Sequence, residues 1–120
     1  MVARILIAED EEAVRALVAR ALTQDGHDVV TASDGSEALE AFARAKSRFD
    51  LLLTDIKMPL MDGIALALAV ARDDPELPIL LMTGYADQRE RASGLDALIH
   101  DVIAKPFTLL EIQYAVAGAL

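Results

Sequence analysis

Carboxylates, a threonine and a lysine stand directly after short apolar runs in this chain of 120 residues. Glu9 and Asp10 follow the run ILIA, Asp55 ends LLLTD, Thr83 ends ILLMT, and Lys105 follows DVIA. Carboxylates that share a site raise one another's pKa values, so we expect a hard divalent cation such as Mg²⁺ to compensate them. A lysine and a threonine hydroxyl beside that cation can stabilise phosphoryl oxygens, and an aspartate can itself be a phosphate-accepting nucleophile.

The elements that must position these side chains alternate between apolar runs and helical patterns. The sequence predicts strands within residues 3–8, 27–32, 49–55, 78–84 and 98–105, and helices over 11–25, 33–46, 64–72, 86–98 and 108–120. Such alternation is typical of an α/β fold with an open parallel sheet and helices on both faces. Ligands bind outside the carboxyl ends of the strands in these folds, so we expect the polar residues named above to converge there.

Composition narrows the class of protein. The length suits one domain over residues 1–120, no cysteine is present to form disulfides or thiolate metal sites, and the first residues are not a signal peptide. We therefore expect a cytoplasmic protein, and no apolar run is long enough to span a membrane. The net charge of −9 disfavours nucleic acid as a partner, because an acidic surface repels phosphate backbones.

Rival phosphate-binding and nucleotide-binding sites lack their motifs. The segment AEDEEA after the first strand is not the G-x-G-x-x-G of a dinucleotide site, and the chain has no G-x-x-x-x-G-K-[ST] loop. A haloacid-type phosphatase would carry a second acid two residues after Asp55, where this chain has Lys57. Asp62-Gly63 is interpreted as a structural turn in which Asp62 caps the following helix.

Six short motifs occur in order along the chain: Glu9-Asp10, Asp55, Lys57-Met58-Pro59, Asp62-Gly63, Thr83-Gly84 and Lys105-Pro106-Phe107. Together they resemble the receiver domain of two-component response regulators, over essentially the whole chain. The resemblance implies the flavodoxin-like (βα)5 doubly wound sheet with strand order 2-1-3-4-5. It also implies a signalling switch whose only catalysis is its own phosphoryl transfer and slow self-dephosphorylation.

The resemblance assigns roles to single residues. Asp55 would be the phosphoacceptor, and Glu9, Asp10, Asp55 and the backbone carbonyl of Lys57 would bind Mg²⁺. Thr83 and Lys105 would hold the phosphoryl group. The donor would be a sensor histidine kinase or a histidine phosphotransfer protein.

Residues that flank the site are expected to modulate it: Lys57, Gly84 and Tyr85. Long side chains at Lys57 and Tyr85 would shield the aspartyl phosphate from water. Receivers of this family usually have an aromatic residue three positions before the lysine, and this chain has Val102 there. The usual aromatic switch is therefore in doubt, and Tyr85 or His100 are candidates to replace it.

The last helix, TLLEIQYAVAGAL, is apolar almost all round. Because the sequence ends directly after it, we expect an output by protein–protein contact, through this helix with the preceding strand and helix. The surface would bind a downstream protein or form a homodimer. A finer resemblance to the CpdR type of single-domain receivers suggests a protease adaptor system. The alternatives are a phosphorelay shuttle, a receiver cut from a hybrid kinase or transcription factor, and a pseudo-receiver that takes no phosphate.

Overall fold

The computed structural model describes residues 2–45, 48–84, 92–95 and 97–120, and its centre is a five-stranded parallel sheet. The strands are β1 (Arg4–Ala8), β2 (Asp28–Ala32), β3 (Leu51–Asp55), β4 (Ile79–Thr83) and β5 (Asp101–Ala104). Their order is β2-β1-β3-β4-β5, which confirms the predicted flavodoxin-like sheet. All five predicted strands are present, each with slightly narrower bounds than expected.

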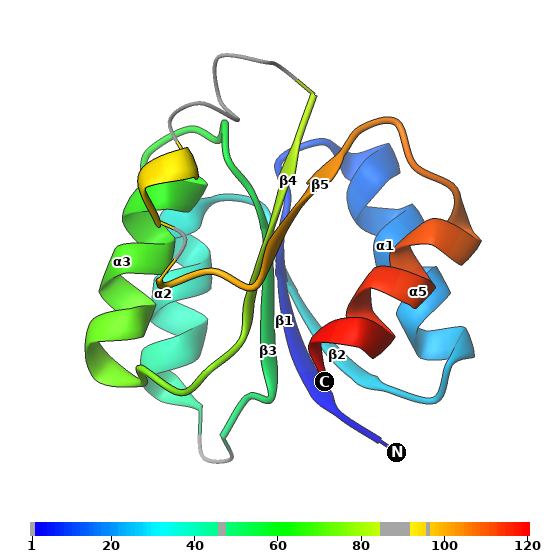
Figure 1. The fold of residues 1–120 in the computed structure, drawn as a ribbon, viewed down its shortest axis with the longest axis horizontal. Helices are drawn as coiled ribbons and strands as arrows, with labels where there is room; N and C mark the ends of the chain where they lie inside the picture. The colour runs from blue at the N-terminus through cyan, green and yellow to red at the C-terminus, as the bar shows by residue number, and fades with distance from the viewer. Residues whose placement is uncertain (1, 46–47, 85–91, 96) are drawn as a thin grey trace.

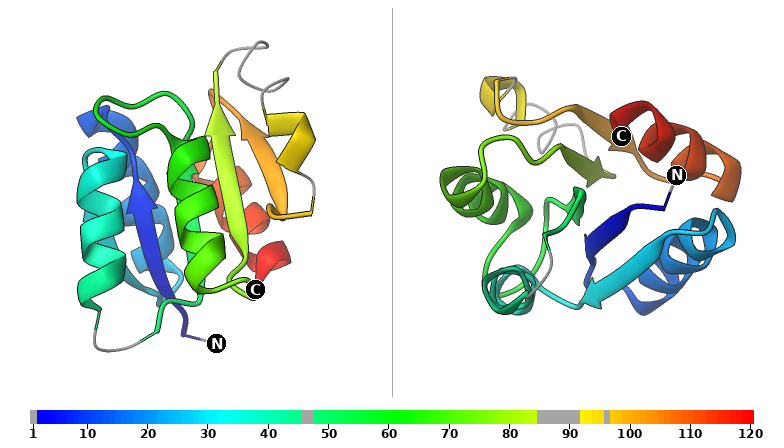
Figure 2. Two further views of the ribbon diagram at one scale, coloured as in Figure 1. Left: turned by 90° about the vertical axis from the view of Figure 1, so that its left-hand side faces the viewer. Right: turned by 90° about the horizontal axis from the view of Figure 1, so that it is seen from below.

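Helices cover both faces of the sheet (Figure 1). α1 (Glu12–Gln24) and α5 (Leu109–Ala119) pack on one face, whereas α2 (Gly35–Arg44) and α3 (Gly63–Asp73) pack on the other, as the two views of Figure 2 also show. The helix predicted over 86–98 lies mostly outside the described residues. Its described part contains the short 3-10 helix η1 (Ser93–Leu95).

The central strands explain why the sequence is so apolar. Every residue of β3 and β4 is buried, because a central parallel strand has helices on both of its faces. Leu51 and Leu53 of β3 pack in the core beneath α1 and α5, whereas Leu52 packs in the core beneath α2 and α3. A strand buried on both faces is a rigid mount for whatever follows it, and Asp55 is its last residue.

Side-chain caps fix where three of the helices begin. Asp34 accepts a hydrogen bond from the backbone N–H of Glu37 at the start of α2, and Asp62 accepts one from that of Ala65 at the start of α3, which confirms its predicted capping role. Thr108 begins α5 with a capping box that it forms with Glu111. The Asp34 cap accounts for the start of α2 at Gly35 rather than at residue 33, where the sequence predicted it.

In the described part of the chain, no helix combines the length and the apolar character that crossing a bilayer requires.

Candidate functional site

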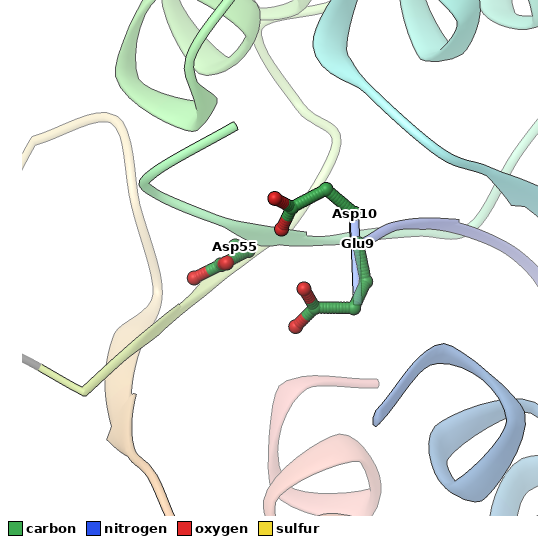
Figure 3. A group of neighbouring side chains, drawn as sticks. All are labelled: Glu9, Asp10 and Asp55. Atoms are coloured by element: carbon green, nitrogen blue, oxygen red, sulfur yellow. The ribbon is translucent and has the colours of Figure 1, made fainter. Parts of the chain in front are cut away.

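Three acidic side chains meet at the carboxyl ends of β1 and β3. The two strands are hydrogen-bonded neighbours, with Ala8 paired to Thr54, so the residues that follow on β1 lie beside Asp55. Glu9, Asp10 and Asp55 each place a carboxylate oxygen within 4.8 Å of the others. Figure 3 shows the three carboxylates around one small volume, with Glu9 and Asp10 on the segment that follows β1 and Asp55 at the end of β3. The predicted convergence of the three acids is confirmed.

Lys105 reaches this cluster from the end of β5. Its Nζ atom lies 2.6 Å from Oε1 of Glu9 and 3.2 Å from Oδ2 of Asp55. The backbone N–H of Lys105 donates to the carbonyl of Thr83, and the peptide bond between Lys105 and Pro106 is cis. The lysine was expected to meet a phosphoryl group, and the structure shows that it bridges two of the three acids.

Burial sets the electrostatics of the cluster. Glu9 is 0% exposed and Asp55 is buried, whereas Asp10 is exposed. Burial raises the pKa of Glu9 to about 7, against the opposing effect of its hydrogen bond with Lys105. Burial also raises the pKa of Asp55, although the positive charge of Lys105 works in the other direction.

For Lys105, the effects of neighbouring charges and hydrogen bonds on the pKa outweigh the effect of burial. Burial alone would lower the pKa of Lys105, but its hydrogen bond to Glu9 and the negative charges of Asp55 and Glu9 outweigh that effect and raise it. The ammonium group therefore stays charged at neutral pH and compensates part of the negative charge. The site consequently combines three acids with one resident cation.

The other predicted site residues lie around the same edge. Thr83 is buried at the end of β4, beside Ala104 in the register, and Gly84 follows it at the surface. A Cβ atom built at Gly84 would lie 3.8 Å from the Cβ of Lys105, so an alanine would also fit there. Lys57 is exposed in the loop after β3.

Val102, at the position where receivers usually have an aromatic residue, is half-buried and packs against the core beneath α2 and α3. Of the two candidates to replace that aromatic residue, His100 is exposed. Tyr85 lies outside the described residues.

Contacts around Glu9 and Asp55 were not expected from the sequence. Arg15 in α1 donates from Nη1 to the carbonyl oxygen of Glu9 at 2.9 Å, and the backbone N–H of Glu11 donates to Oε2 of Glu9 at 3.1 Å. Gly63 approaches β3 so closely that a Cβ atom there would overlap the carbonyl oxygen of Asp55. The Asp62-Gly63 turn was predicted, but the sequence gives no signal for this packing or for the role of Arg15.

An open pocket of about 810 Å³ lies over the cluster. Asp10, Asp55 and Lys105 line its polar part. Its apolar part comes from α1 and from the loops after β3 and β5, and consists of Val14, Leu17, Met58, Pro59, Pro106 and Phe107. The pocket therefore offers a charged floor beside an apolar wall, and the floor is accessible from outside.

The donor set suits a hard cation. All three converging groups are carboxylates, the ligands that Mg²⁺ prefers in proteins. Oε1 of Glu9 is fully buried, and its partner among the described residues is the ammonium group of Lys105, which leaves the oxygen a second lone pair. A buried carboxylate oxygen with spare acceptor capacity, facing two other acids, fits a cation ligand.

Comparison with known proteins identifies the family. The profile of the response regulator receiver domain matches residues 5–117. The chain belongs to the response regulator receiver family. Response regulator MprA of Mycobacterium leprae is 41% identical over 117 residues, which cover 98% of this chain and 50% of that protein. The chain spans about half the length of the curated relatives it matches.

Solved receiver structures share the fold closely. The chemotaxis response regulator CheY4 of Vibrio cholerae superposes with a TM-score of 0.89 at 29% identity, covering 100% of both chains. TrrA of Thermotoga maritima, whose structure is a complex with Mg²⁺-BeF, superposes with a TM-score of 0.86 at 30% identity, covering 98% of this chain and 99% of that one. The protein is therefore a signalling module of two-component systems, and the finer resemblance to the CpdR type stays a prediction.

Proposed function

We propose that residues 1–120 form a single receiver domain in the cytoplasm, and that Asp55 accepts a phosphoryl group from a phosphohistidine. The donor is a sensor histidine kinase or a histidine phosphotransfer protein. The observation that carries the proposal is the convergence of the three carboxylates within 4.8 Å, with Lys105 bridging two of them. The membership of the receiver family and the TrrA complex with Mg²⁺-BeF support the same function.

The proposed step is a direct displacement at phosphorus. A carboxylate oxygen of Asp55 forms the new P–O bond while the P–N bond of the phosphohistidine breaks, and the imidazole leaves with the electron pair of that bond. The product is an acyl phosphate on Asp55. The departing imidazole takes up one proton from solvent as the P–N bond breaks, so that it leaves in its neutral form. Asp55 suits this role because β3 holds it rigidly at the floor of an open pocket.

Glu9, Asp10, Asp55 and the backbone carbonyl of Lys57 would hold Mg²⁺ in this proposal. The cation would supply charge stabilisation for the phosphoryl oxygens. Lys105 then exchanges its contact with Asp55 for one with a phosphoryl oxygen, and the Thr83 hydroxyl donates to another.

Lys57, Gly84 and Tyr85 are assigned a modulating role in the lifetime of the acyl phosphate. Lys57 and Gly84 are exposed, whereas Tyr85 lies outside the described residues. Lys57 and Gly84 line the pocket, which supports their part of this assignment.

The output surface that we propose includes the outer face of α5. Ile112 and Val116 of α5 are buried against the sheet, whereas Leu110 and Tyr114, one turn apart, are 73% and 84% exposed. This apolar pair, with the neighbouring β5, is proposed to bind a downstream protein or a second copy of the chain. The CpdR-type resemblance favours a protease adaptor system as the downstream partner. A phosphorelay shuttle is the alternative function.

The test is the mass of the intact protein after incubation with acetyl phosphate, with and without Mg²⁺, beside the Asp55→Asn variant. One added phosphoryl group that requires Mg²⁺ and is absent from the variant is the expected result. No addition to a folded protein that binds Mg²⁺ would contradict the assignment of Asp55. Incubating the phosphorylated protein with a histidine phosphotransfer protein separates the two functions, because only a shuttle passes the phosphoryl group on.

A further inference from the structure

The loop between β3 and α3, residues 56–62, has a strained backbone. The N–H of Met61 donates to the carbonyl of Pro59 at 2.7 Å, which closes a three-residue γ-turn around Leu60. The φ angle of Leu60 is 68°, the left-handed region that a leucine rarely adopts, and this form of the γ-turn is the rarer and more strained one. The side chain of Leu60 is 86% exposed, so its own burial does not offset this strain.

Backbone strain of this kind persists only where the surrounding structure enforces it. The surrounding structure here includes Gly35, the first residue of α2. A Cβ atom built at Gly35 would overlap the carbonyl oxygen of Met61 and lie 2.8 Å from its carbonyl carbon and 3.0 Å from its Cβ. Figure 2 shows the loop arching over the beginning of α2. Gly35 is not in the left-handed region, so the space beside it, rather than its backbone conformation, is what requires a glycine.

The far end of the loop is fixed to β3. The N–H of Gly63 donates to the carbonyl of Ile56 at 2.7 Å, and a Cβ atom at Gly63 would lie 2.8 Å from the carbonyl carbon of Asp55. The loop is thus held by β3 at its base and by the start of α2 at Met61. Lys57 lies in the loop between these two attachments.

We infer that Gly35 is a positioning residue for the cation site, acting through Met61 on the loop that carries Lys57. The inference rests on the proposed function, in which the Lys57 carbonyl is a Mg²⁺ ligand. Mg²⁺ requires near-ideal octahedral geometry, so a loop displaced by one methyl group presents a poorly placed carbonyl. Substitutions that disturb the support of metal ligands typically weaken metal affinity by about 10–100-fold.

The experiment compares the Mg²⁺ dissociation constants of three variants by calorimetric titration, together with their unfolding free energies in urea. Gly35→Ala should weaken Mg²⁺ binding by about tenfold or more. Asp34→Ala removes the α2 cap without adding an atom toward Met61, so this variant should unfold at a lower urea concentration but keep its Mg²⁺ affinity. Gly118→Ala, on an open part of α5, is the matched glycine control. It should leave the Mg²⁺ affinity unchanged and should not lower the unfolding free energy.

The outcomes separate the inference from the proposed function. A wild-type protein that does not bind Mg²⁺ contradicts the proposed function itself. If the wild type binds Mg²⁺ and the folded Gly35→Ala variant binds it with the same affinity, only the inference is overturned. The inference is also overturned if Asp34→Ala loses as much Mg²⁺ affinity as Gly35→Ala.

A measurement on the wild-type protein covers the case in which Gly35→Ala does not fold. Because coupling between sites is reciprocal, Mg²⁺ should slow hydrogen exchange at the amides of Glu37 and Met61. Unchanged exchange at both, under saturating Mg²⁺, overturns the inference.

Discussion

Replacing Glu9 by glutamine is expected to stabilise the metal-free protein at about pH 8 and to leave it nearly unchanged at about pH 4.5. Glu9 is 0% exposed, and burial raises its pKa to about 7 from an ordinary 4.5. The folded protein therefore keeps a proton on Glu9 over a pH interval in which the unfolded chain has released it. Stability falls as the pH rises through that interval, and the full loss is present above about pH 7.

The size of the effect follows from the same two pKa values. Their difference corresponds to roughly 3 kcal/mol at most, and a glutamine, which carries no charge, should recover about 1–3 kcal/mol of it. Lys105 does not alter this trend between pH 5 and pH 8, because its pKa is raised and it stays charged there. Mg²⁺ should reverse the order of the two proteins, since a cation that binds the folded state stabilises the wild type more than the variant.

The assay is urea unfolding of both proteins in EDTA and in saturating Mg²⁺, at acidic and at alkaline pH. Glu76→Gln, which changes the same charge at an exposed position, is the matched control and should be near neutral at each pH. The reasoning is refuted if Glu9→Gln is less stable than the wild type at about pH 8 in EDTA. The reasoning is also refuted if Glu9→Gln raises the unfolding free energy by the same amount at both pH values, because such a gain would not come from the titration of Glu9.

Three further substitutions test other contacts of the structure, each by urea unfolding. Lys105→Met should lower the unfolding free energy by about 2–4 kcal/mol at about pH 8, because the buried carboxylates of Glu9 and Asp55 lose their partner. A larger loss of stability at acidic than at alkaline pH would argue against this cause. Leu60→Gly should raise it by up to about 1 kcal/mol, because glycine relieves the left-handed strain; a loss of stability would mean that the turn is not strained. Thr108→Ala should lower it by about 1 kcal/mol through the lost capping box, and Thr108→Ser should restore most of that loss.

The sequence predicted the sheet well because its signals are local. Buried strands such as β3 and β4 are continuous apolar runs, and the carboxyl end of each is marked by a polar residue such as Asp55 or Thr83. Once the alternation indicated a parallel sheet, the meeting of Glu9 with Asp55 followed from the topology. The helix over 86–98 lies mostly outside the described residues, so that prediction stays untested over most of its length.

What the sequence did not predict depends on contacts between distant segments. Gly35 looks like an ordinary residue at a helix start, and only the folded chain shows that Met61, from another loop, fills the space beside it. Arg15 likewise follows a helical pattern with no sign that its guanidinium reaches back to the carbonyl of Glu9. The bridge from Lys105 to both acids was missed because the lysine was interpreted only through its contact with a phosphoryl group.

The position of Lys105 on the edge strand β5 affects how the site comes into being during synthesis. The ribosome delivers the chain from its N-terminus, so Glu9 and Asp55 emerge well before the lysine that compensates them. Until β5 joins β4, the acids at the carboxyl ends of β1 and β3 lack the counter-charge of Lys105, so their mutual repulsion is less compensated. The addition of the last strand thus completes the charge balance, and the proposed phosphoacceptor site is assembled only when β5 is in place.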